Sequence, residues 1–232
     1  MRLKDFFIDL ILPNRCPCCG GFIEWDRLVC EKCLSEIEFV KDDVCPHCGK
    51  TNCVCDTGLN YSECVVGAYY DGIVRDGILS LKLDNGINFA KFFAQLLSSK
   101  LTDRGLCDEI DVVTAVPTTR GKLKQRGYNQ AREIAEIISK RIEKPFYDNI
   151  LTKLDKGLIQ HTLDFKSRRE AVRGAFGFSA GTDVGGKTVL LCDDIITTSS
   201  TLNECACQLK NAGAKKVICT VIATTRLKNQ SI

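Results

Sequence analysis

The chain has 232 residues, of which 44% are hydrophobic and 26% charged, and its formal net charge is +3. This is the composition of an ordinary globular protein, and so slight a basic excess does not by itself indicate a nucleic-acid partner. The length accommodates one α/β domain with a small appendage, or two small domains.

The N-terminal segment 1–16 contains a short apolar run that Asp5 and Asp9 interrupt. It has no small-residue cleavage site, and crossing a bilayer takes ~20 apolar residues, more than any run in the chain offers. We therefore expect a cytoplasmic protein without a membrane span. Its first helix should pack one apolar side on another part of the protein, and that side consists of Phe6, Phe7, Leu10 and Ile11.

Cysteine is the unusual residue type, with fifteen in the chain and nine of them between Cys16 and Cys55. Reduced Cys-x-x-Cys pairs suit a metal better than a disulfide, and two facing pairs form a tetrahedral thiolate cage for structural Zn²⁺. A redox-active Cys-x-x-Cys is the alternative, which so many half-pairs in one short segment disfavour. The first predicted set is Cys16, Cys19, Cys30 and Cys33. The second is Cys45, Cys48, Cys53 and Cys55.

The last pair of the second set has only one intervening residue, so the sequence leaves open whether one or two zinc ions bind. Cys18 and His47 lie inside Cys-x-x-Cys knuckles, and we expect both to point away from the metal. The six later cysteines are expected to be small hydrophobic residues of the core.

From residue 59 onward, apolar strands alternate with amphipathic helices, which predicts a parallel sheet covered on both faces. We place the boundary near residue 58, with an N-terminal helix and zinc-ribbon module at 1–58 and an α/β domain at 59–232. The polar, basic segment 158–178 reads as a loop or hairpin with one helical turn. Strands are predicted at 64–70, 110–117, 187–194 and 215–225, with a further candidate at 149–154. Helices are predicted at 73–82, 87–101, 129–142 and 200–213.

The strand at 187–194 ends in two adjacent carboxylates, Asp193 and Asp194, which repel each other and are costly to bury. In such a sheet, ligands bind past the carboxyl ends of the strands, where a helix N-terminus also favours an anion. A ribose with a 5′-phosphate offers a diol for the acids and an anion for the following hydroxyl-rich loop. That loop contains Thr197, Thr198, Ser199, Ser200 and Thr201.

Two plainer interpretations of the same pattern stay open. Two acids after an apolar strand can bind Mg²⁺ and accept phosphate, or they can do no more than cap the following helix. The hydroxyl run can be an ordinary helix cap, with Ser200 or Thr201 as the capping residue and Glu204 completing a capping box.

At these residues the sequence resembles the type I phosphoribosyltransferases, in which the corresponding stretch binds 5-phosphoribosyl 1-diphosphate (PRPP). Residues 112–135, VVTAVPTTRGKLKQRGYNQAREIA, resemble the strand, diphosphate loop and helix start of the competence protein F (ComF) branch. With the cysteine pairs, YYDGIVRDGILSLK and a Gly-Ala-Phe near residue 174, the resemblance covers nearly the whole chain. It implies PRPP bound with Mg²⁺ and a diphosphate loop that includes Pro117, Thr118, Thr119, Arg120 and Arg126.

The sequence also departs from the family pattern. Ser199 stands where relatives carry glycine in the PRPP loop, and Ala171 where they carry asparagine, although the Gln160-x-x-Leu163 spacing is kept. The segment 154–173 is the candidate for a mobile lid over the site. The basic residues of this segment, together with Lys153 just before it, could close on phosphates or form a solvated face. They are Lys153, Arg168, Arg169 and Arg173.

Three classes of function follow. The first is a phosphoribosyltransferase with an unknown acceptor, acting in DNA uptake or natural competence. The second is a non-catalytic PRPP- or nucleotide-sensing protein that binds single-stranded DNA and works with competence-machinery proteins. The third is a zinc-ribbon adaptor for another protein. The basic stretch 120–132 contains one aromatic residue, Tyr128, and favours neither of the first two classes.

Overall fold

The structure is a computed structural model that describes residues 14–41, 43–51, 53, 55, 58–81, 86–154, 174–179 and 181–226. The predicted N-terminal helix and most of segment 158–178, including the three arginines of the predicted lid, lie outside the described residues. None of the helices in these ranges is both long enough and apolar enough to cross a membrane.

Four parallel strands form the central sheet in the order β1-β6-β5-β2. Nearly every residue of these strands is buried or half-buried, as expected for parallel strands with both faces covered. The predicted α/β fold with a parallel sheet is therefore confirmed. The strands are β1 (Glu63–Tyr69), β2 (Val112–Ala115), β5 (Thr188–Ile196) and β6 (Lys216–Thr224).

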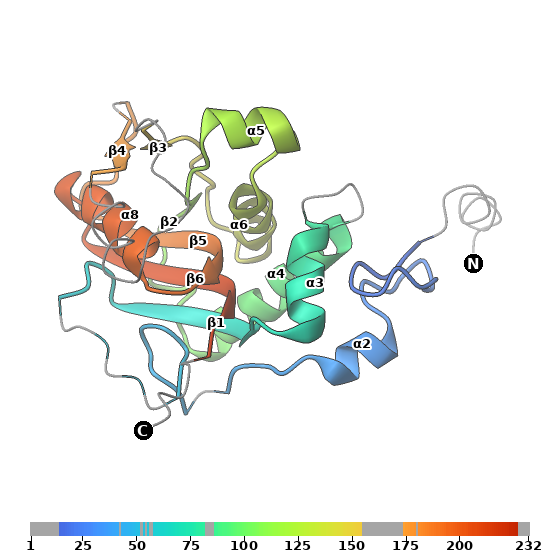
Figure 1. Cartoon of the computed structure of the whole chain (residues 1–232). Coiled ribbons are helices and arrows are strands. Elements are labelled where there is room, and N and C mark those ends of the chain that lie inside the picture. The colour runs from blue at the N-terminus through green and yellow to red at the C-terminus, as the bar shows by residue number, and fades with distance from the viewer. Residues whose placement is uncertain are drawn as a thin grey trace, which may run out of the picture.

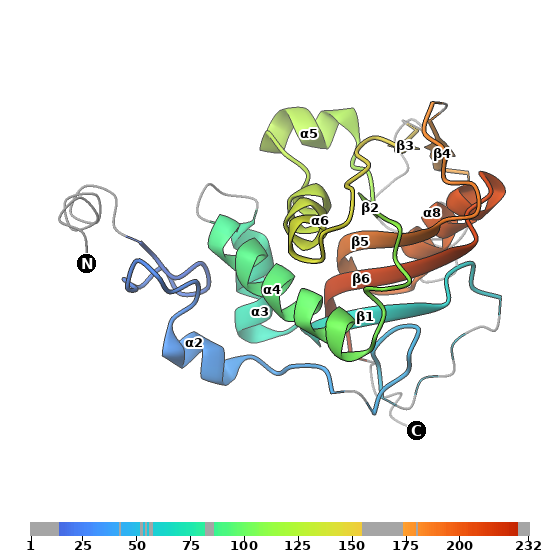
Figure 2. The same cartoon turned by 180° about the vertical axis from the view of Figure 1, so that it is seen from behind.

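Helices cover both faces of the sheet (Figures 1 and 2). On one face α3 (Gly72–Ser80), α4 (Ile87–Asp103) and α6 (Gln130–Arg141) pack over a core that includes the fully buried Phe89 and Phe93. On the other face lies α8 (Ser200–Asn211), which buries the side of the helix that carries Leu202, Cys205, Ala206 and Leu209. These elements agree with the predicted ones to within a few residues.

Both edges of the sheet are covered by short extended segments. The chain between the two cysteine clusters runs antiparallel to β1, where Val40 N–H donates to the Gly67 carbonyl and Tyr69 N–H to the Glu38 carbonyl. At the opposite edge, Phe146 pairs in parallel with Val113 of β2. The cysteine-rich segment is thus joined to the sheet by backbone hydrogen bonds.

Several short elements complete the fold. The helices α2 (Glu31–Glu36) and α5 (Arg120–Arg126) have no counterpart among the predicted elements. The strands β3 (Leu151–Lys153) and β4 (Phe176–Phe178) pair antiparallel, so the two ends of the predicted lid segment lie next to each other.

The later cysteines only partly match their predicted burial. Cys64, Cys192, Cys205 and Cys219 are buried in the core. Cys107 and Cys207 are only partly buried, because they lie in the turn after α4 and on the outer side of α8.

Candidate functional site

The eight predicted cysteines form two separate clusters. Cys16, Cys19, Cys30 and Cys33 bring their four sulfurs within 4.8 Å of one another, and so do Cys45, Cys48, Cys53 and Cys55. The first cluster packs near α3 and α4 through Ile73 and Phe92, whereas the second lies against β1 on the α8 face (Figures 1 and 2). The cysteine-rich segment therefore contacts the sheet domain at two different places.

Both clusters have the geometry of a closed zinc site. Tetrahedral Zn²⁺ with Zn–S bonds of about 2.3 Å places its sulfurs roughly 3.8 Å apart. The Cys19 and Cys30 sulfurs are 3.8 Å apart in the first cluster. In the second, the sulfur–sulfur separations, including that of Cys53 and Cys55, lie between 3.2 and 3.5 Å, somewhat shorter than this value. Four thiolates around one point leave no position for a substrate, so both sites are structural.

The cluster thiols differ in their environments, because the pKa of Cys16 is lowered whereas burial and neighbouring thiols raise the pKa of Cys33, Cys48 and Cys55. Burial opposes ionisation of Cys16, but backbone N–H groups of Cys30, Cys19 and Cys18 outweigh it and lower the Cys16 pKa to about 6. Burial and the neighbouring thiols instead raise the pKa of Cys18, which belongs to neither cluster. His47 also lies outside the second cluster, as predicted, and its ring packs edge-on against Tyr61.

Asp193 and Asp194 lie near the carboxyl end of β5, which extends two residues beyond them. Asp194 N–H donates to the Asp193 carboxylate at 2.9 Å. Burial and then the Asp194 charge raise the pKa of Asp193 well above its usual range, while Lys153 acts in the opposite direction. A carboxylate in this position is costly for the folded protein until a cation or a diol faces it.

The hydroxyl-rich loop leads from β5 into α8. Ser199 occupies the N-cap position in the left-handed region, with φ 61° and ψ −5°. Among the described residues, no side chain caps the first turn of α8. Glu204, which a capping box would need, instead accepts a hydrogen bond from Gly174 N–H at 2.8 Å. The capping-box interpretation is therefore wrong, and the first-turn N–H groups of α8 are left without a capping side chain.

The predicted diphosphate loop starts beside this site. Val116 N–H donates to the Cys192 carbonyl, so the chain leaves β2 next to the residue that precedes Asp193. Pro117 and Thr118 form the loop, Thr119 caps α5 by accepting from Lys122 N–H, and Arg120 begins that helix. Arg126 ends α5, and its side chain lies outside what the structure describes.

Lys153 connects the β3–β4 pair to the acids. Burial lowers its pKa, followed by the charge of Lys122, while Asp193 acts to raise it. Its ammonium also lies 5.1 Å from the centre of the Phe176 ring in β4. The β3–β4 pair and α5 lie on the same side of the sheet (Figure 1). Among the four basic residues named with the predicted lid, Lys153 is the one that the structure describes, and its charge acts on Asp193.

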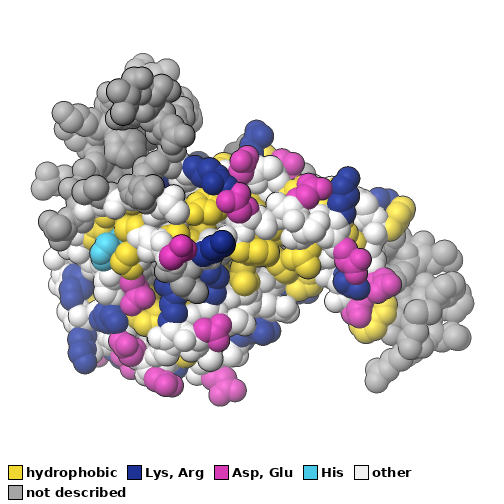
Figure 3. Space-filling view, turned by 90° about the horizontal axis from the view of Figure 1, so that it is seen from below, with side chains coloured by type: hydrophobic (Ala, Val, Ile, Leu, Met, Phe, Trp, Pro, Cys, Tyr) yellow, Lys and Arg dark blue, Asp and Glu magenta, His cyan; other side chains and the backbone are white. Residues whose placement is uncertain are grey.

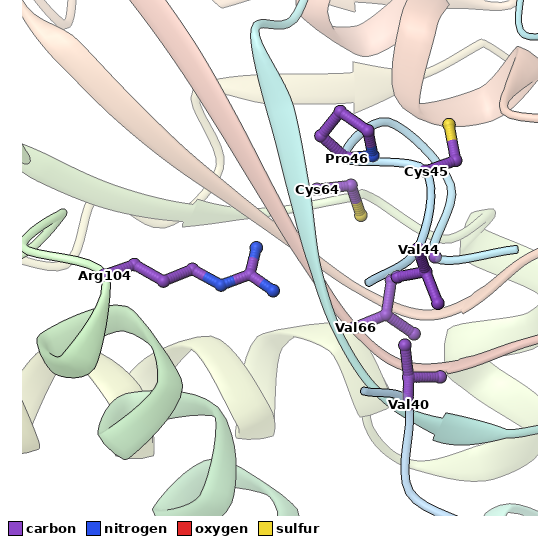
Figure 4. A pocket seen from close by; sticks show the side chains of 8 residues that line it. Val40, Val44, Cys45, Pro46, Cys64, Val66 and Arg104 are labelled. Carbon is purple, nitrogen blue, oxygen red and sulfur yellow. The ribbon is translucent and has the colours of Figure 1, made fainter. Parts of the chain in front are cut away.

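Two cavities lie close to these features. One of about 440 Å³ is lined by the diphosphate-loop residues Pro117 and Thr118, and also by Tyr128 and Asn129 at the start of α6. The other, of about 190 Å³, lies beside the second cysteine cluster and is lined by Cys45 and Pro46 of the knuckle and by Cys64 and Val66 of β1 (Figure 4). In that view the Arg104 side chain extends from the end of α4 toward β1.

The sequence analysis missed three residues that contact the hydroxyl-rich loop and α8. Lys50 donates to the Thr197 carbonyl, Asn60 donates to the Asn203 side chain, and Tyr61 interacts with Ser199. The two residues of each hydrogen-bonded pair are more than 140 positions apart in the chain, since they are separated by 147 and 143 residues. Local sequence patterns do not predict contacts between residues so far apart in the chain.

The comparisons with known proteins agree with this architecture. Residues 7–65 match the double zinc ribbon domain, and residues 83–231 match the phosphoribosyl transferase domain. Competence protein F of Haemophilus influenzae is 27% identical over 192 residues, which cover 81% of each chain. Competence protein ComFC of Streptococcus pneumoniae is 27% identical over 201 residues, covering 83% of this chain and 86% of that protein. The DNA utilization protein YhgH of Escherichia coli O157:H7 is 28% identical over 107 residues, 46% of each chain.

The parallel sheet, the acid pair at its carboxyl edge and the two thiolate clusters define a phosphoribosyltransferase-fold protein preceded by a double zinc ribbon. The chain belongs to the phosphoribosyl transferase domain family, in the ComF branch with an N-terminal zinc ribbon. The family predicted from the sequence is confirmed.

Proposed function

We propose that this protein binds PRPP together with Mg²⁺ at the carboxyl edge of β5 and β2, and that it acts in DNA uptake. In this proposal Asp193 and Asp194 hold the ribose hydroxyls, and the loop 197–201 holds the 5′-phosphate. The loop that starts at Pro117 holds the diphosphate.

The observation that carries the proposal is the uncapped start of α8 directly after the acid pair. Helix N-terminal N–H groups need acceptors, and the positive end of the helix dipole favours an anion. Where a side chain does not supply the acceptor, a phosphate can. The left-handed Ser199 supports the same interpretation, because backbone strain of this kind recurs where a loop is shaped around a ligand.

The environment of Asp193 supports a ligand at the acids. A half-buried carboxylate beside a second one is unfavourable by itself, as its raised pKa indicates. Mg²⁺ or a pair of ribose hydroxyls would offset both the cost of burying the carboxylate charge and its repulsion from the second carboxylate. Mg²⁺ bound with PRPP would also neutralise the diphosphate charge.

The proposed role in DNA uptake rests on the relatives, two of which are named competence proteins and a third a DNA utilization protein. Charges of both signs are interspersed on the face shown in Figure 3. A broad basic surface, typical of tight binding to nucleic acid, is not found on that face among the described residues. We propose that PRPP is the ligand of this site and that contact with DNA is a separate property of the protein.

Calorimetric titration with PRPP and Mg²⁺ tests the proposed site through the double substitution Asp193→Asn/Asp194→Asn. We expect the wild-type protein to bind and the double variant to lose binding, with zinc content unchanged. Asp103→Asn/Asp108→Asn is the matched control, because it removes the same charge from two exposed positions. Both residues precede β2 in the chain and so lie near the amino ends of the strands, away from the proposed site. Unaltered affinity in the Asp193/Asp194 variant would refute the assignment.

A second experiment separates transfer from sensing. Incubation with PRPP, Mg²⁺ and a panel of bases and amines measures diphosphate release. Release that depends on one acceptor identifies a phosphoribosyltransferase, whereas binding without release identifies a PRPP sensor. Single-stranded DNA binding that weakens as salt rises would support the DNA-binding form of the sensor.

A further inference from the structure

The second cysteine cluster contacts the loop that is proposed to hold the 5′-phosphate. The contact is made by Lys50, which follows Cys48 by two residues and is only 8% exposed. Its Nζ donates to the Thr197 carbonyl at 2.7 Å. A buried ammonium is costly unless its N–H groups find acceptors, so this bond is a strong constraint on both partners.

The cluster itself determines where Lys50 lies. Cys45 N–H donates to the Lys50 carbonyl at 3.0 Å, and Gly49 N–H donates to the Cys45 carbonyl at 2.9 Å. Gly49 has φ 67°, and a Cβ at this position would come within 2.7 Å of Val66 in β1. The knuckle that carries two sulfur ligands is therefore folded tightly on itself and pressed against the sheet.

Two further contacts join the same regions. Asn60 donates through its backbone N–H and its side-chain amide to Asn203 Oδ1 in α8, at 2.7 and 3.1 Å. The Tyr61 hydroxyl donates to the His47 carbonyl at 3.0 Å, and the Ser199 side chain acts on it as a hydrogen-bond partner. The Thr197 end of the loop, Ser199 and the first turn of α8 are thus contacted by residues at or just after the cluster.

The Lys50 bond has a consequence for the loop backbone. In a trans peptide the carbonyl and the following N–H point in opposite directions. With the Thr197 carbonyl turned toward Lys50, the Thr198 N–H points away from the cluster. An ammonium beside the loop also adds positive potential where an anion is proposed to bind.

We propose that Lys50 is a positioning residue for the phosphate loop, so that the second metal-binding knuckle forms part of the phosphoribose site. This inference rests on the proposed function. It identifies Lys50 as the residue that holds the loop 197–201 in the shape that binds phosphate. Zinc in the second cluster would hold Lys50 in place, whereas zinc in the first cluster would have no such effect, because that cluster packs elsewhere. Lys50 would act through Thr197 and would not itself take part in transfer.

The test compares Lys50→Met with Lys32→Met in the full-length, zinc-loaded protein. Lys32 lies inside the Cys30–Cys33 knuckle of the first cluster and is exposed, so it is a matched control. Backbone amide exchange of residues 197–201 is measured without ligand, and the Kd for PRPP with Mg²⁺ is measured by calorimetry. We expect faster exchange and about tenfold or greater loss of affinity for Lys50→Met at unchanged zinc content. Lys32→Met should match the wild type in both.

Wild-type exchange and affinity in a zinc-loaded Lys50→Met protein would overturn the proposal. If Lys50→Met loses zinc, Lys50→Gln decides the question, because its shorter side chain keeps a polar end group on the knuckle but removes the ammonium that donates to the Thr197 carbonyl. Faster exchange at residues 197–201 in zinc-loaded Lys50→Gln supports the proposal, and unchanged exchange overturns it. If the wild-type protein does not bind PRPP, the proposed function fails, while the exchange comparison still decides the role of Lys50.

Discussion

Ser199 occupies a backbone conformation that glycine adopts at lower cost. Its φ of 61° lies in the left-handed region, which costs a residue with a Cβ about 1–2 kcal/mol. Its side chain interacts with Tyr61. The loop therefore keeps its shape through contacts from outside the loop.

We expect Ser199→Gly to raise the free energy of unfolding by about 0.5–1 kcal/mol, since the greater freedom of glycine in the unfolded chain cancels part of the relieved strain. For a chain of this size the gain corresponds to roughly 1–4 °C in Tm. Thermal unfolding with zinc present measures it. A lower Tm would mean that the Ser199 side-chain contact outweighs the backbone strain.

Asp193 is predicted to lower the stability of the ligand-free protein. Because its pKa is raised in the folded state, the folded protein holds this proton more tightly than the unfolded chain. The contribution of Asp193 to the free energy of unfolding is therefore most favourable below the ordinary aspartate pKa. It is lost as the pH rises toward the pKa that Asp193 has in the folded protein.

Asp193→Asn should thus raise the Tm in the absence of Mg²⁺ and PRPP, and the difference from wild type should grow as the pH rises above about 4, the ordinary aspartate pKa. The same substitution should weaken PRPP binding. Thermal scans across this pH range measure the first effect. A difference that shrinks toward neutral pH would show that the carboxylate is already well compensated in the free protein.

The two cysteine clusters are separate elements with separate consequences. Zinc analysis of the purified protein should give two ions per chain, falling to about one for Cys19→Ser and about one for Cys53→Ser. Because the second cluster carries Lys50, only Cys53→Ser should also weaken PRPP binding. Equal loss of PRPP affinity in both variants would mean that the ribbon unfolds as one unit.

Among the elements, those with strong local patterns were predictable. The apolar strand at 187–194 and the helix at 129–142 follow directly from their periodicity, and the cysteine spacing gave the two sulfur sets. The short helix α5 was not predicted, because Arg120–Arg126 is polar and its start depends on the Thr119 cap rather than on an apolar face. A strand was predicted at 149–154, where β3 lies, but its pairing with β4 was not, because the two strands are separated by the segment 154–175.

Some residues of the candidate site were predictable from the sequence and others were not. The position of Asp193 and Asp194 at a strand end was readable from the sequence, since it needs only the strand and the following loop. The contacts of Lys50 and Asn60 were not, because they arise when the ribbon packs on the sheet domain.

For the whole molecule, the ribbon is built into the sheet domain rather than added to it. The segment between its clusters covers the β1 edge, its second cluster fills the face beside α8, and its first cluster packs near α3 and α4. Figure 1 shows this course around the sheet domain. We therefore propose that the boundary predicted near residue 58 divides the sequence without dividing the folded protein into independent parts.

The most direct test of the central claim is a crystal structure of the zinc-loaded protein soaked with PRPP and Mg²⁺. The account predicts electron density for a 5′-phosphate at the first turn of α8, with the ribose hydroxyls facing Asp193 and Asp194. Both carboxylates turned onto protein partners, with PRPP absent or bound elsewhere, would contradict it.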